Sequence, residues 1–180
     1  MKKSVIACVV MTVAMTATSI GQQPSQAPLR IFINELQPGA MSAPQFCTLV
    51  FEDHRFHTEK ADIKQGKAFD RKIYDGQMSD AEWNALGTII DSKEFRDLKV
   101  PPTVPPLVMQ DTHPYTISVV RGENFQNMEF LDPRSLKPYE AQVRPLLHWW
   151  KGFRGQHTTL SAGSPDARCK LDSTHAVFAQ

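Results

Sequence analysis

The chain has 180 residues and a mass of 20.3 kDa, which suits one compact domain with tails. With 20 Lys and Arg against 19 Asp and Glu it is almost neutral, and this argues against a nucleic-acid-binding protein, which usually carries a basic surplus. A hydrophobic share of 41% is enough for a core and excludes a wholly disordered chain.

The first 21 residues have the pattern of a secretory signal peptide. Lys2 and Lys3 precede an uncharged apolar run, residues 5–17, that is too short to span a bilayer. Ser19 and Gly21 are the small residues that typically precede a cleavage site, so we expect cleavage near Gly21. The sequence therefore predicts a secreted or periplasmic protein that has no integral membrane span once the signal is removed.

The cysteines fit this export. Cys8 is lost with the signal, which leaves Cys47 and Cys169. An even pair in an exported chain predicts a disulfide, here between an early strand and the C-terminal segment. Two unpaired thiols are the alternative, because the sequence does not show whether the two Cα atoms come within bonding range.

Residues 22–45 are polar and proline-containing, and they predict a linker with a short strand near residues 30–36. A single domain is expected over residues 46–154. It begins with a hairpin of strands over 46–52 and 55–61, because Cys47, Leu49 and Phe51 alternate onto one face. A further extended stretch is expected at residues 69–74.

A helix is predicted to begin after Ser79. Ser79 and Glu82 have the spacing of a capping box, and Met78 and Trp83 have the spacing of a hydrophobic staple. The proline-dense segment of residues 100–114 that comes later cannot be helical and predicts an extended bridge.

A second hairpin is predicted over residues 115–120 and 125–131, and a second helix begins at Pro138, with Trp150 on its buried stripe. Residues 155–180 are rich in small polar residues and predict a flexible tail. The order hairpin, helix, hairpin, helix predicts an α+β fold. In it, two hairpins form one antiparallel sheet and two helices pack on one face, a ββαββα-like arrangement.

Residues 74–83 (YDGQMSDAEW), followed by Leu86 and residues 95–98 (FRDL), carry a family resemblance. They resemble a group of small exported bacterial domains of unknown function that share a Gly-x-x-Ser-x-x-Glu helix entry and a Phe-x-x-Leu turn. The layout is also similar to the helix-on-sheet modules of β-lactamase-inhibitor-like proteins. The resemblance covers roughly residues 46–153 and implies a fold without implying an activity.

Catalytic and metal-binding patterns are sparse. His54 and His57 lie close in sequence, but their odd spacing places them on opposite faces of a straight strand. The sequence contains no His-Glu-x-x-His or Cys-x-x-Cys pattern and no Gly-x-Ser-x-Gly elbow. We therefore predict no catalytic residue, no metal site and no cofactor, and interpret Asp53, His54 and Arg55 as a polar hairpin tip.

Trp149 and Trp150 are the most unusual neighbours in the chain. Two consecutive helical positions differ by about 100°, so Trp150 takes the buried stripe and Trp149 borders it. Lys151 and Arg154 flank Trp149, and this combination is a candidate contact surface for a partner.

The sequence thus predicts a non-enzymatic exported module that binds a protein or a cell-envelope partner. Its candidate contacts are Asp53, His54, Arg55 and Trp149. The alternative is a small metal-dependent or hydrolytic enzyme that uses His54, His57 and His113. Three histidines around one pocket would favour the enzyme, whereas histidines on separate faces would favour the binding module.

Overall fold

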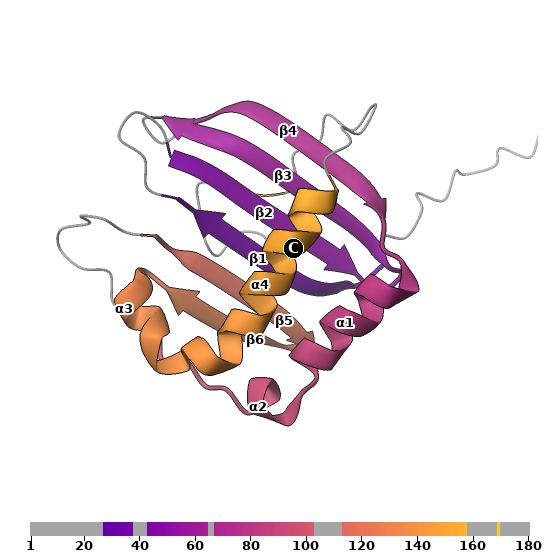
Figure 1. Ribbon diagram of the computed structural model, residues 1–180, viewed down its shortest axis with the longest axis vertical. Helices are drawn as coiled ribbons and strands as arrows, with labels where there is room; N and C mark the ends of the chain where they lie inside the picture. Colours follow the sequence, from indigo (N-terminus) through magenta and orange to yellow (C-terminus); the bar gives the residue numbers. More distant parts are fainter. Residues whose placement is uncertain (1–26, 38–42, 65–66, 103–112, 158–168, 170–180) are drawn as a thin grey trace, which may run out of the picture.

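A six-stranded antiparallel sheet, in the strand order β4-β3-β2-β1-β5-β6, forms the centre of the protein (Figure 1). The computed structural model describes residues 27–37, 43–64, 67–102, 113–157 and 169. The strands are β1 (Leu29–Leu36), β2 (Ala43–Phe51), β3 (Arg55–Lys64), β4 (Lys67–Gln77), β5 (Tyr115–Arg121) and β6 (Asn124–Phe130). The helices are α1 (Asp80–Ile90), α2 (Lys93–Arg96), α3 (Pro133–Leu136), the 3-10 turn η1 (Lys137–Tyr139) and α4 (Glu140–Gln156).

The predicted α+β class and both predicted hairpins are confirmed. β2 pairs with β3 in a register that places Thr48 opposite Thr58, and β5 pairs with β6. The predicted ββαββα order needs correction, because four strands precede the first helix and form one meander. The extended stretch expected at residues 69–74 is part of the longer strand β4, which pairs with β3.

β1 lies at the centre of the sheet, inside the segment expected to be a linker. It pairs with β2 on one side and with β5 on the other, so it joins the meander to the second hairpin. Ile31 and Ile33 belong to the core under the helices, whereas Phe32 belongs to a second apolar cluster on the opposite face. A strand buried on both faces has no alternation of polar and apolar residues, which explains why its sequence gave only a weak strand pattern.

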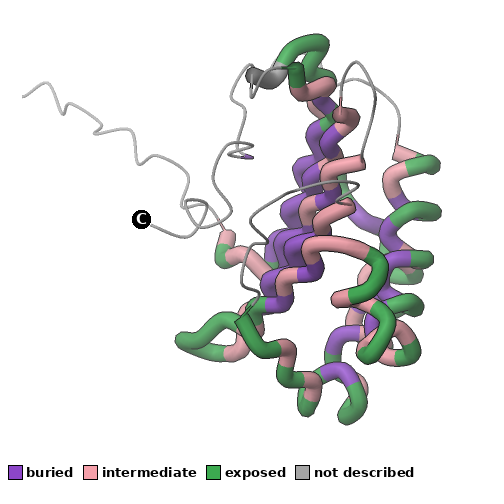
Figure 2. The backbone as a smooth tube through the Cα atoms, turned by 90° about the vertical axis from the view of Figure 1, so that its left-hand side faces the viewer, coloured by how far each residue is buried: buried purple, intermediate pink, exposed green. Residues whose placement is uncertain are grey.

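The helices lie on one face of the sheet, and an edge-on view shows helical coils on one side of the strands (Figure 2). Their packing differs from the predicted pair of helices, because one long C-terminal helix, α4, is the main element across that face. α4 crosses that face and buries a stripe of its own residues, namely Val143, Leu146, Leu147, Trp150 and Phe153. The position predicted for Trp150 is confirmed, because its side chain is fully buried. We refer to this side as the helix face and to the other side as the far face.

α1 begins as predicted. Ser79 is the N-cap residue, and its hydroxyl accepts a hydrogen bond from the Glu82 backbone N–H at 3.3 Å. The Glu82 carboxylate accepts in return from the Ser79 backbone N–H at 2.8 Å, which completes the capping box. Capping of this kind is worth about 1 kcal/mol, and it fixes where the chain turns from β4 into α1.

The far face carries a smaller apolar cluster that is closed by the predicted disulfide. Its buried members are Phe32, Cys47, Leu49, Phe51 and Cys169. Cys47 and Cys169 are bonded, with their Cα atoms 6.3 Å apart and 122 positions apart in sequence. A loop of this length stabilises the fold by about 5 kcal/mol on the chain-entropy model.

Some predictions concern residues outside the described part of the chain. These are the signal segment of residues 1–21, most of the proline-rich bridge (residues 103–112) and most of the C-terminal tail (residues 158–168 and 170–180). Among the described helices, none combines the length and the apolar character needed to cross a bilayer.

Gly76 in β4 provides a test of the packing between the edge strand and α4. A Cβ atom at this position would lie 2.6 Å and 2.7 Å from two ring carbons of Phe56. That ring is held by Phe153 and His157, with centroid separations of 5.0 Å and 4.5 Å, so it cannot easily move away. We expect Gly76→Ala to lower the free energy of unfolding by about 1–3 kcal/mol in urea titrations.

Gly152→Ala is the matched control, because a Cβ atom at this position of α4 meets nothing within 4 Å. This change removes a glycine from a helix interior, and we expect it to stabilise the protein by up to about 1 kcal/mol. Equal stabilities for Gly76→Ala and the unmodified chain would contradict the contact with Phe56.

Candidate functional site

The predicted contact turn, residues 53–55, connects β2 to β3 and contacts α1. The Arg55 guanidinium donates to the Asp53 carboxylate at 2.6 Å, and both side chains are largely exposed. His54 adopts a left-handed backbone conformation (φ 66°) and stacks on the ring of Trp83, with the two centroids 4.1 Å apart. The stacking attaches the turn to the first turns of α1.

An open groove of about 600 Å³ begins at Trp83 and runs along α1. It is lined by Arg30, Trp83, Asn84, Gly87, Thr88, Asp91 and Ser92. The Arg30 guanidinium lies 4.3 Å from the Trp83 ring centroid and pairs with Asp91 at 2.8 Å. The groove therefore offers an aromatic ring, amide and hydroxyl groups, and charges of both signs.

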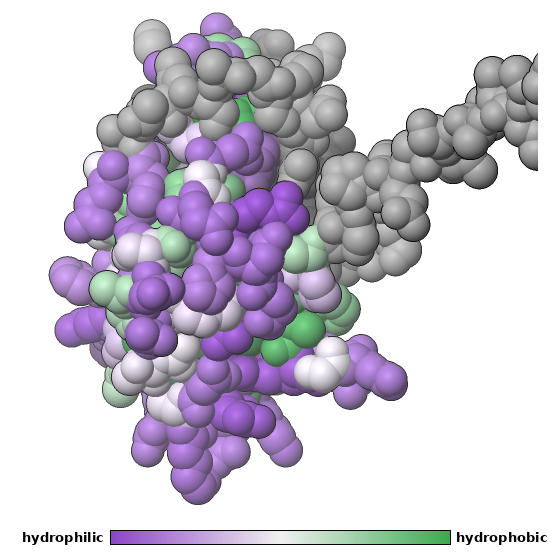
Figure 3. Space-filling model, turned by 90° about the vertical axis from the view of Figure 1, so that its right-hand side faces the viewer, coloured by the Kyte–Doolittle hydropathy of each residue, from purple (hydrophilic) through white to green (hydrophobic). Residues whose placement is uncertain are grey.

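The side of the molecule on which α1 lies is mostly hydrophilic, with small apolar areas between polar ones (Figure 3). Because the turn at residues 53–55 adjoins the groove through the His54–Trp83 contact, the two form one continuous surface. We call this the turn–groove surface.

Trp149, the remaining predicted contact residue, lies on α4. It is partly buried and stacks on Phe153, with centroids 5.1 Å apart and the rings inclined by 18°. The sequence-based expectation that Trp149 borders the stripe of Trp150 agrees with this position. Its role as a contact for a partner stays a prediction.

The three histidines of the alternative enzyme do not converge. His54 stacks on Trp83 at the turn. His57 is buried on the far face, where its ring lies between two carboxylates. His113 precedes β5 and donates to Glu35 on the helix face. The structure thus places the three side chains in three separate environments.

A buried polar cluster around Glu35 was missed by the sequence reasoning. Glu35 is fully buried near the end of β1, and its carboxylate accepts from the Tyr115 hydroxyl at 2.7 Å and from His113 Nε2 at 2.8 Å. The Arg154 guanidinium of α4 lies 2.7 Å from the second carboxylate oxygen. A single acidic residue inside an apolar segment (RIFINEL) was the available clue, since an acid is rarely buried without partners.

Burial of Glu35 would raise its pKa, but the hydrogen bond from Tyr115, the charge of Arg154 and the hydrogen bond from His113 outweigh this effect. The pKa of Glu35 is therefore below its usual value, so the carboxylate is charged at neutral pH. The same environment raises the pKa of Tyr115, through burial first and then its hydrogen bond to Glu35. With these two pKa shifts the Tyr115 hydroxyl keeps its proton and Glu35 stays ionised, so Tyr115 is the donor and Glu35 the acceptor of their hydrogen bond.

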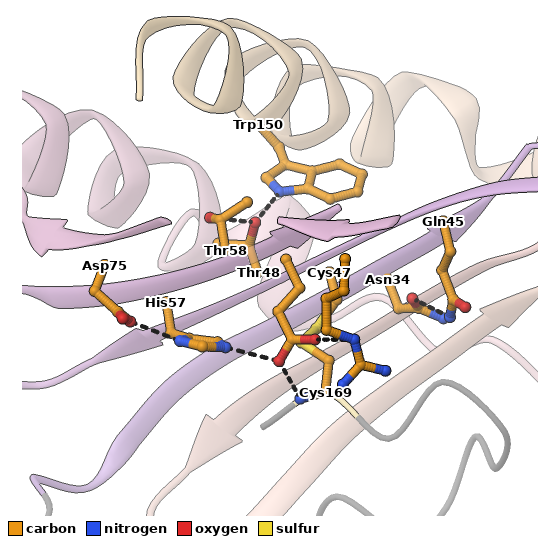
Figure 4. The surroundings of a disulfide bond; sticks show 11 residues. Asn34, Gln45, Cys47, Thr48, His57, Thr58, Asp75, Trp150 and Cys169 are labelled. Carbon is orange, nitrogen blue, oxygen red and sulfur yellow. Dashed lines mark hydrogen bonds and ion pairs between the residues drawn. A yellow bond between two sulfur atoms is a disulfide. The ribbon is translucent and has the colours of Figure 1, made fainter. Parts of the chain in front are cut away.

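A second polar cluster, with the buried His57 and Glu59 at its centre, lies on the far face beside the disulfide (Figure 4). His57 Nδ1 is 2.6 Å from the Asp75 carboxylate, and His57 Nε2 is 2.8 Å from the Glu59 carboxylate. Glu59 also accepts from the Cys169 backbone N–H at 2.8 Å, and Arg71 lies 3.5 Å from its other oxygen. We call these residues, together with Cys47, which is bonded to Cys169, the far-face cluster.

The pairing of His57 with Glu59 could have been anticipated from their spacing. Residues two apart in a strand lie on one face, and a His-x-Glu pattern inside the predicted strand over 55–61 meets that condition. From sequence alone, His57 was instead grouped with His54 and His113 as possible ligands and was not paired with Glu59. The participation of Cys169 depended on the disulfide, which the sequence left open.

Comparison with protein-family models finds no match, and comparison with curated proteins finds no significant relative. Function therefore has to be inferred from the geometry of this chain.

The Glu35 cluster predicts a pH-dependent stability difference. We expect Glu35→Gln to lower the free energy of unfolding by about 3–5 kcal/mol at neutral pH, because Arg154 would lose its buried partner. Since the pKa of Glu35 is lower in the folded state, its contribution is present above the usual value of 4.5 and is lost as the pH falls below it. Urea titrations between pH 7 and about pH 3 should show the difference shrinking.

Glu123→Gln, in the exposed β5–β6 turn, is the matched control. We expect it to change the free energy of unfolding by less than about 0.5 kcal/mol at every pH. A Glu35→Gln variant whose deficit stays constant down to low pH would contradict the assignment of a charged Glu35.

Proposed function

We propose that this protein is a non-enzymatic exported module, secreted or periplasmic, that binds a protein or cell-envelope partner through the turn–groove surface. The observation that carries the proposal is the groove along α1 and its junction with the 53–55 turn through the stacking of His54 on Trp83. Three of the four contact residues predicted from sequence belong to this surface.

The chemistry of the groove suits a polar partner better than a buried small-molecule substrate. Small-molecule sites are usually enclosed and mostly apolar, whereas this groove is open and its walls carry Arg30, Asp91, Asn84 and Thr88. Polar groups around an aromatic residue are common where proteins contact one another. The exposed Asp53 and Arg55 extend the charged part of the surface beyond the groove.

The placement of the histidines also supports binding over the alternative enzyme. That alternative requires His54, His57 and His113 around a single pocket, and they lie in three environments. The proposal includes export, with removal of the signal segment. Export brings the mature protein to the compartment in which envelope components are available as partners.

Capture from cell-envelope extract by variants of the purified protein tests this function. Asn84→Arg and Thr88→Arg place a long charged side chain into the groove from exposed helix positions, without removing a core residue. We expect each to reduce capture of the partner at least 10-fold, which corresponds to about 1.4 kcal/mol of binding energy. Capture is measured by quantitative mass spectrometry against the unmodified protein.

Ala141→Arg on α4 is the matched control, because it introduces the same side chain at an exposed helix position outside the groove. It should capture the partner as the unmodified protein does. Trp149→Ala is the second arm. Loss of capture in this variant alone would move the contact to α4, and equal capture by all variants would contradict the proposed surface.

A further inference from the structure

We propose that the far-face cluster becomes a metal site when the Cys47–Cys169 disulfide is reduced. In that state the two thiolates, His57 Nε2 and the Glu59 carboxylate bind one divalent cation that prefers sulfur and nitrogen ligands, such as Zn²⁺. The inference concerns a different part of the molecule from the turn–groove surface, and it does not depend on the proposed binding function.

The sheet itself assembles the ligands. Cys47 on β2 is directly opposite Glu59 on β3, and His57 precedes Glu59 by two positions, so all three point to the far face. In the oxidised protein Cys169 is held at the same place by its bond to Cys47, and its backbone N–H also donates to Glu59 at 2.8 Å, a contact that does not need the disulfide. One ligand atom each from His57, Glu59 and Cys169 lies within 4.8 Å of the other two, and all three residues are buried.

These separations are close to those of a tetrahedral zinc site. Zn²⁺ with ligands at about 2.0–2.3 Å holds them about 3.3–3.8 Å apart. The ligand atoms of His57, Glu59 and Cys169 already lie within 4.8 Å of one another, and the two sulfur atoms have to move apart once their bond is broken. Two sulfur atoms, one imidazole nitrogen and one carboxylate oxygen are the ligand types that Zn²⁺ accepts, whereas Mg²⁺ and Ca²⁺ prefer oxygen alone.

Asp75 provides a second, independent indication of a metal site. Its carboxylate lies 2.6 Å from His57 Nδ1 (Figure 4). This contact orients the ring and directs Nε2 toward Glu59, at 2.8 Å. A histidine that binds a metal through one nitrogen usually donates its other N–H to a carboxylate or carbonyl, and this outer contact increases its basicity. Asp75 and His57 already have this arrangement around the cluster.

The chemical step balances with a dithiol as the reductant. The dithiol transfers two electrons and two protons to the disulfide, the Cys47–Cys169 bond breaks, and the reductant forms its own disulfide. Metal binding then releases the two thiol protons to solvent, as well as any proton carried by Nε2. In the oxidised protein both sulfur atoms are in the disulfide and neither is a thiolate. Disulfide formation and metal binding at this site therefore exclude each other.

Cobalt titration of the reduced protein tests the proposal, because Co²⁺ takes tetrahedral zinc sites and its thiolate complexes absorb light. With the disulfide reduced by a phosphine, we expect one equivalent of Co²⁺ to give thiolate charge-transfer absorption and tetrahedral visible bands, both removed by one equivalent of Zn²⁺. The oxidised protein should give neither. Amide circular dichroism measured in parallel reports whether the reduced chain stays folded.

His57→Gln should weaken Co²⁺ binding at least 10-fold, and Asp75→Asn should weaken it roughly 10–100-fold while leaving the thiolates intact. His54→Gln, at the turn beside α1, is the matched control and should bind as the unmodified protein does. Absence of thiolate bands in the reduced protein would overturn the proposal. So would unchanged affinity in both His57→Gln and Asp75→Asn, or a reduced chain that unfolds and that Zn²⁺ does not restore.

Discussion

The packing of α4 across the sheet is the contact on which the rest of the helix face depends. Trp150 is its centre: the ring is fully buried, and its indole N–H donates at 2.7 Å to Thr48, whose hydroxyl is 3.0 Å from that of Thr58. Further along the helix Arg154 pairs with Glu35, and His157 reaches the capping box of α1 through Glu82 at 2.7 Å. One helix thereby joins β1, the β2–β3 hairpin and α1.

The central strands β1 and β2 are buried on both faces, which distinguishes this sheet from a two-layer fold with one fully solvated side. The far face holds its own apolar cluster, and Cys169 closes it from the other end of the chain. A polar side chain that is buried on either face of the strands β1 to β3 has to be paired, whereas the edge strands β4 and β6 expose polar residues such as Arg71 and Asn127. Glu35 on the helix face and His57 on the far face both meet this requirement, each with charged partners from distant segments.

Polar groups in the interior and polar groups on the surface have different roles in the two proposals. Interior polar groups are held by partners that fix their protonation and orientation, as the lowered pKa of Glu35 illustrates. The turn–groove surface instead presents charged and hydrogen-bonding groups to solvent around Trp83, where a partner can reach them. The far-face cluster is buried like the Glu35 cluster, but we propose that it can also bind a ligand. Whether its sulfur atoms can bind a metal depends on the Cys47–Cys169 bond.

By itself the sequence determined the features whose physical causes lie within a few residues. The α1 capping box, the two hairpins and the buried stripe with Trp150 follow from contacts at short spacing. Only the tertiary structure decided the central position of β1, the meeting of Glu35 with Tyr115 and Arg154, and the approach of Cys169 to Glu59. These partners come from segments far apart along the chain, and strand order brings them together, which no local pattern encodes.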